Sequence, residues 1–168
     1  MKYVCSTCGQ THEGLPDISF DAPVYWADIP EHERETRGHL DSDLCTIDNN
    51  DFFVRGCLEI PITGTPDLFT WGIWVTLSRS NFDRYVDLFE VDPPPTEEPW
   101  FGWFSNRLPG YPETLKLKTR VHLRSQRRRP RIELEPTDHP LAIHQREGIA
   151  LESLLSIIGP RLHGTSPP

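Results

Sequence analysis

Residues 52–90 constrain the fold of this chain more than any other stretch. Two runs rich in β-branched and aromatic residues, at 52–62 and 68–77, flank a segment of turn-forming residues. Such runs predict a pair of antiparallel strands. The next run, at 80–90, changes to a helical period. Its apolar face consists of Phe82, Tyr85, Val86 and Phe89. The stretch therefore predicts a β-hairpin with a helix packed against it.

A second hairpin is predicted over residues 115–135. Residues 115–123 alternate between apolar and polar side chains, and residues 132–135 return along them. The turn between them carries four cations, Arg127, Arg128, Arg129 and Arg131. Clustered guanidinium groups favour the binding of phosphate or of an acidic partner. The alternative interpretation is an edge hairpin that is kept soluble by its charge.

The sequence CSTCG at residues 5–9 is a metal-binding signal. Two thiolates separated by two residues and followed by glycine are typical of a tetrahedral zinc site, so we expect a structural zinc knuckle. The candidate ligands are Cys5, Cys8, Cys45 and Cys57. His12 and His39 are alternatives for the last two positions. A redox pair and small buried thiols are the other interpretations of these cysteines.

Length and composition bound the domain organisation. The 168 residues include five tryptophans and eight phenylalanines, which predicts one globular domain at 1–160 and a disordered tail at 161–168. The chain has no apolar run of membrane-spanning length and no apolar export signal at its start, so we expect a cytoplasmic protein. The net charge of −8 argues against non-specific binding of nucleic acid.

An enzyme site is an alternative to a binding site. Asp138 and His139 are adjacent in a bend, and Arg107 lies in another loop that prolines stiffen. Acid–base chemistry requires the three side chains to meet in one pocket. The sequence contains no nucleophile elbow, zinc-protease motif, phosphate-binding loop or dinucleotide fingerprint. It therefore favours an interaction module, with another protein as the partner, over a catalyst.

Several longer motifs resemble those of one protein family. They are CSTCGQTHEGLP at 5–16, SDLC at 42–45, FFVRGCLEIP at 52–61, NRLPGYP at 106–112, LKTRVHL at 117–123 and LEPTDHPLAIHQREG at 134–148. Together they resemble the bacterial domain of unknown function family 2199. The resemblance implies a bacterial single-domain protein, and it transfers no catalytic residue.

The sequence as a whole predicts an α+β fold. We expect a mostly antiparallel sheet of five or six strands, two longer helices, one short helix and the N-terminal cysteine knuckle. The predicted function is a small binding or interaction module with structural zinc. The alternatives are an enzyme site at Arg107, Asp138 and His139, and a polyanion or phosphate site at 127–131.

Overall fold

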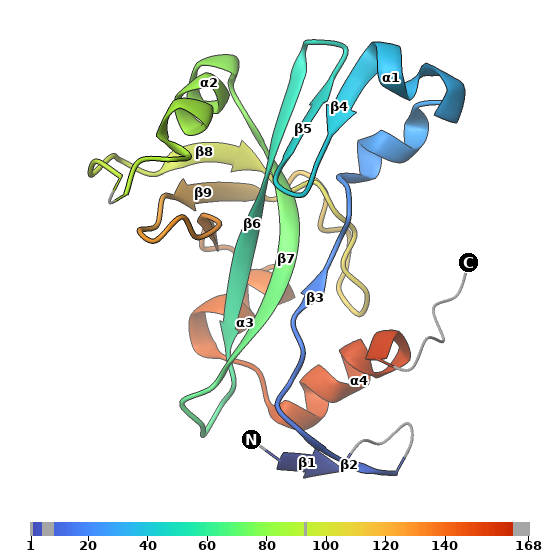
Figure 1. Ribbon diagram of the computed structural model, residues 1–168. Helices are drawn as coiled ribbons and strands as arrows, with labels where there is room; N and C mark the ends of the chain where they lie inside the picture. Colours follow the sequence, from blue (N-terminus) through green and yellow to red (C-terminus); the bar gives the residue numbers. More distant parts are fainter. Residues whose placement is uncertain (1, 5–8, 93, 163–168) are drawn as a thin grey trace.

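The computed structural model describes residues 2–4, 9–92 and 94–162, and an eight-stranded sheet forms its centre (Figure 1). The strands of this sheet are β3 (Ile18–Ser19), β4 (Gly38–Leu40), β5 (Leu44–Ile47), β6 (Asp51–Pro61), β7 (Leu68–Leu77), β8 (Trp100–Trp103), β9 (Lys118–His122) and β10 (Arg131–Leu134). A separate antiparallel pair consists of β1 (Lys2–Val4) and β2 (Thr11–Glu13). The helices are α1 (Arg34–Arg37), α2 (Arg79–Leu88), α3 (Pro140–Glu147) and α4 (Leu151–Leu162), with 3-10 helices η1 (Val24–Asp28) and η2 (Glu31–Glu33).

The predicted hairpin of β6 and β7 is confirmed and forms the longest strand pair of the sheet. Its antiparallel register runs from Phe52 opposite Leu77 to Pro61 opposite Leu68. Even-numbered residues of β6 are buried in the main core, and the odd-numbered residues from 55 to 61 are only partly buried. Alternation of side chains across a strand therefore separates a core face from an outer face.

The sheet curls until β8 returns to β7. The residues after β8 bridge to β7 at Val75 and Phe104, and the Ser105 N–H donates to the Trp74 carbonyl at 2.9 Å. Gly102 makes this approach possible, because a Cβ at that position would lie 2.4 Å from the Thr76 carbonyl oxygen. The strands from β6 to β10 thus enclose the main hydrophobic core.

Helices cover the open ends of this curled sheet (Figure 1). Side chains of α2, α3 and α4 join the main core, including Phe82, Leu141 and Ile158. A second, smaller core lies on the outer face of β6 and β7 beneath η1. It consists of Ile29, Cys45, Ile47, Phe53 and Trp74. The residues of η1 and of the smaller core therefore cover part of the outer face of β6 and β7, and a hollow remains at their edge.

The predicted sheet of five or six mostly antiparallel strands is wrong. The sheet has eight strands and is mixed, because β3 runs parallel to β7 and β10 runs parallel to β6. Strand β3 contains two residues and β4 contains three, which is too short for alternation to be visible in the sequence. The parallel pairs also join segments far apart in the chain, such as Ile18 with Trp71.

The helix prediction also needs correction. Four α-helices are present among the described residues, and α3, which begins after the N-cap His139, was not expected. Helix α2 buries Leu88 together with Phe82 and Tyr85, whereas Val86 and Phe89 of the predicted apolar face are exposed. The helix therefore presents two apolar side chains to its surroundings.

Helix α4 continues through Pro160 to Leu162, so the first two residues of the predicted tail are helical. Residues 163–168 lie outside the described part of the chain. Within the described residues, no helix combines the length and the apolar character that crossing a membrane requires.

Candidate anion-binding site

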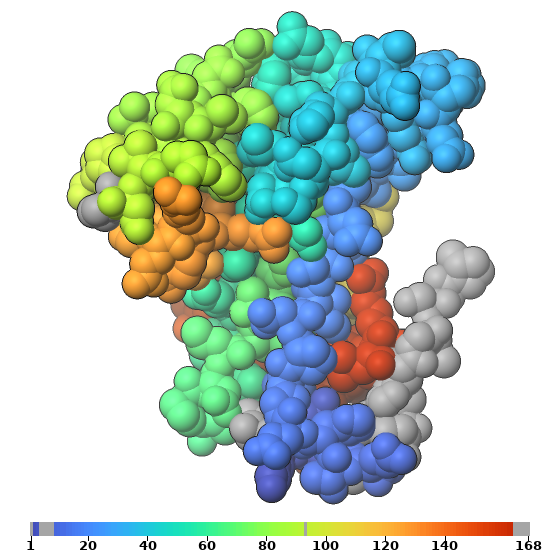
Figure 2. Space-filling view, viewed as in Figure 1, coloured from blue at the N-terminus to red at the C-terminus, as the bar shows by residue number. Residues whose placement is uncertain are grey.

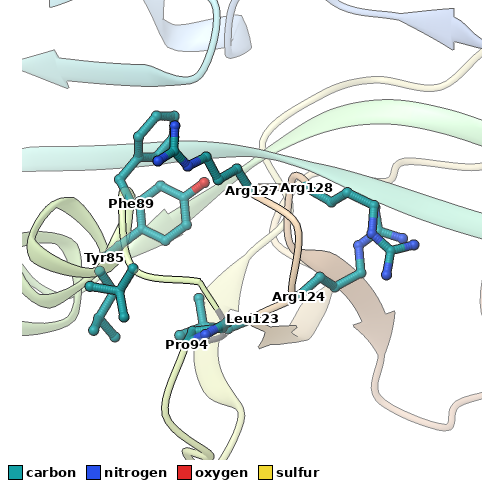
Figure 3. A pocket seen from close by; sticks show the side chains of 9 residues that line it. Tyr85, Phe89, Pro94, Leu123, Arg124, Arg127 and Arg128 are labelled. Carbon is teal, nitrogen blue, oxygen red and sulfur yellow. The ribbon is translucent and has the colours of Figure 1, made fainter.

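The loop between β9 and β10 borders a hollow of about 420 Å³, which we call the arginine hollow. Its lining residues are Asp43, Cys57, Tyr85, Phe89, Arg124, Arg127, Arg128 and Arg129. A crevice of about 30 Å³ adjoins it beside Leu123 and Pro94 (Figure 3). Figure 2 shows the three segments involved, which are this loop, the region of α2 and the turn between β4 and β5, meeting on one face of the molecule.

The loop that carries the arginines is held in one conformation. Gln126 and Arg127 both have φ values in the left-handed region, 63° and 50°, which non-glycine residues adopt only at a cost. Two hydrogen bonds offset this cost. The Gln126 N–H donates to the Asp92 carboxylate at 2.7 Å, and the Arg124 Nε–H donates to the Arg129 carbonyl at 2.7 Å. The guanidinium groups are therefore positioned before a ligand arrives.

Three of the four arginines that line the hollow form ion pairs. The pairs are Arg124 with Glu59 at 2.5 Å, Arg129 with Asp43 at 2.6 Å and Arg127 with Glu90 at 2.9 Å. The first two pairs are partly buried, so solvent screens them less than the third. These pairs fix the arginine side chains and cancel part of their charge.

Two further cations form no ion pair among the described residues, although the Asp21 and Asp43 carboxylates act on Arg55 through their charge. Arg128 lines the hollow and donates from Nε to the Ser125 carbonyl at 3.2 Å. Arg55, beside the hollow, donates to the Ser42 carbonyl at 3.3 Å, and its buried Nε has no partner. Burial, together with the charge of Arg129, lowers the pKa of Arg55. The Arg128 guanidinium therefore adds positive charge to the hollow that no ion pair among the described residues neutralises.

Tyr85 supplies a neutral donor to the same hollow. The residue is only 5% exposed, and its hydroxyl has no hydrogen-bond partner within the described part of the chain. Figure 3 shows the hydroxyl pointing toward the arginine loop. Burial, with a contribution from the Asp43 carboxylate, raises the pKa of Tyr85, so the hydroxyl stays protonated. Burial also raises the pKa of the Cys57 thiol, which keeps it neutral despite the nearby Arg124.

The structure brings together three of the four arginines that the sequence indicated. Arg127, Arg128 and Arg129 line the hollow. Arg131 lies on β10 and forms a 3.5 Å ion pair with Glu133 on its own strand. Sequence reasoning missed the contributions of Arg124 and of Tyr85, because the latter comes from α2, on a different part of the chain.

The structure describes two of the four cysteines of the predicted zinc site and separates them. Cys5 and Cys8 lie outside the described residues. Cys45 is fully buried in the smaller core, where burial raises its pKa to about 12. It lies opposite Phe53, and Cys57 follows four residues further along β6. This separation is about 13 Å, too far for both thiols to bind one ion.

The prediction that a cysteine knuckle forms part of the fold is therefore wrong for the described residues. No group of three or more histidine, cysteine, aspartate or glutamate side chains could hold a metal ion, as far as the described residues go. Zinc binding by Cys5 and Cys8 stays a prediction.

One comparison with known proteins identifies a family. A family model described as "Uncharacterized protein conserved in bacteria (DUF2199)" matches residues 4–149. The chain belongs to this family. The match covers every residue that lines the arginine hollow. No curated protein and no solved structure matches the chain.

In this DUF2199 protein, Arg107 and His139 of the alternative enzyme site make separate contacts. Arg107 pairs with Glu113 at 3.1 Å and lines a hollow that neither Asp138 nor His139 borders. His139 accepts the Leu141 N–H at 3.2 Å as the N-cap of α3. Arg107 and His139 therefore have separate structural roles, and the hollow that Arg107 lines is not bordered by His139 or by Asp138.

Proposed function

We propose that this DUF2199 protein is a binding module that holds an anionic group, a phosphate or a carboxylate, in the arginine hollow. The observation that carries the proposal is Tyr85, a residue only 5% exposed, whose hydroxyl has no hydrogen-bond partner among the described residues and faces a cavity also lined by Arg128. The guanidinium can only donate hydrogen bonds and the hydroxyl can donate one, so a ligand that offers acceptors satisfies both groups.

The geometry supports an anion more strongly than a neutral acceptor. Hydrogen bonds between a guanidinium and an anionic oxygen are worth about 1.5–3 kcal/mol each, roughly twice the value of neutral bonds. The ion pairs of Arg124, Arg127 and Arg129 hold their side chains in the wall of the cavity, so little conformational entropy is lost on binding.

The residues around the hollow favour an anionic group that is carried on a protein segment. Val86, Phe89 and Val91 are large apolar side chains exposed beside the hollow and the crevice. Such exposed apolar residues next to charged groups are characteristic of protein interaction sites. A nucleic acid is less suitable, because the whole chain carries a net charge of −8.

The first experiment titrates the protein with inorganic phosphate at low ionic strength and follows backbone amide shifts by NMR. We expect the largest shifts in the loop between β9 and β10, and about tenfold weaker binding in Arg128→Gln, since one charge-assisted bond is lost. Arg146→Gln is the matched control, because Arg146 pairs with Glu147 on α3, away from the hollow. Equal affinities in the two variants would refute the anion site.

A second experiment tests the carrier. Two phosphoserine peptides that differ only in a leucine or a serine beside the phosphorylated residue are compared by fluorescence polarisation. We expect the leucine peptide to bind more tightly and Phe89→Ser to remove that difference. Equal binding of both peptides, or tighter binding of a single-stranded nucleic acid, would contradict a protein carrier while leaving the phosphate result intact.

A further inference from the structure

A second hollow lies at the edge of the smaller core and is chemically unlike the arginine hollow. Its volume is about 530 Å³, which suits a small organic molecule or one large side chain. Its apolar floor is made by Phe53, Ile29 and Ile47, which are at most 6% exposed. We call it the aromatic hollow.

Two aromatic side chains form its walls. Tyr25 of η1 stacks on Phe53 with ring centroids 5.8 Å apart. Trp103 of β8 lines the same hollow, and its backbone N–H donates to the Thr76 hydroxyl of β7 at 3.0 Å. Trp103 is 39% exposed and is held by edge-to-face packing on Phe101 at 4.8 Å. An exposed tryptophan that lines an apolar cavity offers its ring to a ligand.

The charges that line the hollow are mostly negative once existing ion pairs are taken into account. Arg37 is already neutralised, since it binds Asp48 through two hydrogen bonds of 2.8 and 2.7 Å and Glu33 through a third of 2.9 Å. Asp28 and Asp51 line the hollow and have no ion-pair partner among the described residues.

Lys116 is the single lining cation that is not engaged in an ion pair within the described chain. Among the described residues, the lining therefore carries two unpaired carboxylates and one unpaired ammonium group. The faces of the Tyr25 and Trp103 rings add further negative potential to the hollow. An apolar cavity with aromatic walls and an acidic border is complementary to a cation with an apolar body.

We propose that the aromatic hollow binds an organic ammonium group attached to an apolar body. The body packs on Phe53 and against Trp103, and the ammonium group lies near Asp28 and Asp51. The group belongs either to a free amine or to a lysine side chain of a peptide, since both present the same chemistry. This site is independent of the arginine hollow, so either proposal can fail alone.

The test uses isothermal titration with three probes that share one phenyl ring. We expect 2-phenylethylamine to bind more tightly than neutral 2-phenylethanol and than anionic 3-phenylpropionate. Asp51→Asn and Asp28→Asn should each weaken amine binding about two- to fivefold, as the loss of a partly screened charge pair predicts. Lys116→Met should strengthen amine binding, because it removes a like charge. Asp17→Asn, an exposed position outside the hollow, is the matched control.

Trp103→Ala should weaken the amine about tenfold, and the melting temperature of each variant shows that it remains folded. A capped Lys-Phe dipeptide distinguishes the two sources. Tighter binding of the dipeptide than of the amine indicates a peptide ligand, and the reverse indicates a small molecule. The proposal is overturned if the alcohol or the carboxylate binds as well as the amine, or if Trp103→Ala and Asp51→Asn leave amine binding unchanged.

Discussion

Replacing Tyr85 by phenylalanine tests whether its hydroxyl is reserved for a ligand. Tyr111 provides a matched comparison, because its hydroxyl lies 3.0 Å from His144 Nδ1 within the protein. Removing a hydroxyl that bonds to protein costs about 1 kcal/mol of unfolding free energy. The Tyr85 hydroxyl has no partner in the described residues, while its ring keeps its packing on Phe89. We therefore expect Tyr85→Phe to change the free energy of unfolding by less than about 0.5 kcal/mol.

Urea unfolding followed by tryptophan fluorescence measures both variants. With an m-value of about 2 kcal/mol/M, Tyr111→Phe should lower the midpoint by about 0.5 M and Tyr85→Phe by less than about 0.25 M. In the phosphate titration we expect Tyr85→Phe to weaken binding by about tenfold and Tyr111→Phe to leave it unchanged. If Tyr85→Phe is as destabilising as Tyr111→Phe, or if it leaves phosphate affinity unchanged, the hydroxyl does not serve a ligand.

Three further predictions concern the fold. Gly102→Ala should lower the free energy of unfolding by about 1–3 kcal/mol in urea titrations, because its Cβ would approach the Thr76 carbonyl to 2.4 Å. Cys45→Ser should cost about 1–3 kcal/mol in the same assay, since it buries a hydroxyl in an apolar core, and should leave the zinc content measured by elemental analysis unchanged. Burial lowers the pKa of His144 below 6.5, so its contribution to stability is complete above pH 6.5 and is lost as the pH falls through the folded-state pKa. His144→Gln should therefore flatten the decline of melting temperature below pH 6.5.

Local patterns were sufficient to predict the two hairpins, because alternation along one strand records which side faces the core. The structure pairs these segments as β6 with β7 and β9 with β10. The parallel pairs of Ile18 with Trp71 and of Cys57 with Arg131 depend on contacts between distant segments, and no local pattern encodes them. Helix α3 had a local signal in Pro140 at its first turn, but its weak apolar periodicity concealed it.

The candidate site was only partly predictable for the same reason. Arg127, Arg128 and Arg129 are consecutive in sequence, so their clustering was visible. The place of Tyr85 beside them depends on how α2 packs near that loop, which the helical period alone does not determine. Cys45 and Cys57 cannot share one metal ion because they belong to the same strand pair, in which a fixed rise per residue keeps them apart.

Strand β6 contributes one residue to the lining of the aromatic hollow and another to that of the arginine hollow. Its even-numbered residues face the main core, so only the odd-numbered residues can line a hollow on the outer face. Phe53 forms the floor of the aromatic hollow, Cys57 lines the arginine hollow, and Glu59 pairs with Arg124. A slip of one residue would exchange the two faces and expose the core. The packing that stabilises the sheet therefore also fixes Phe53 and Cys57 about 13 Å apart, with Arg55 between them.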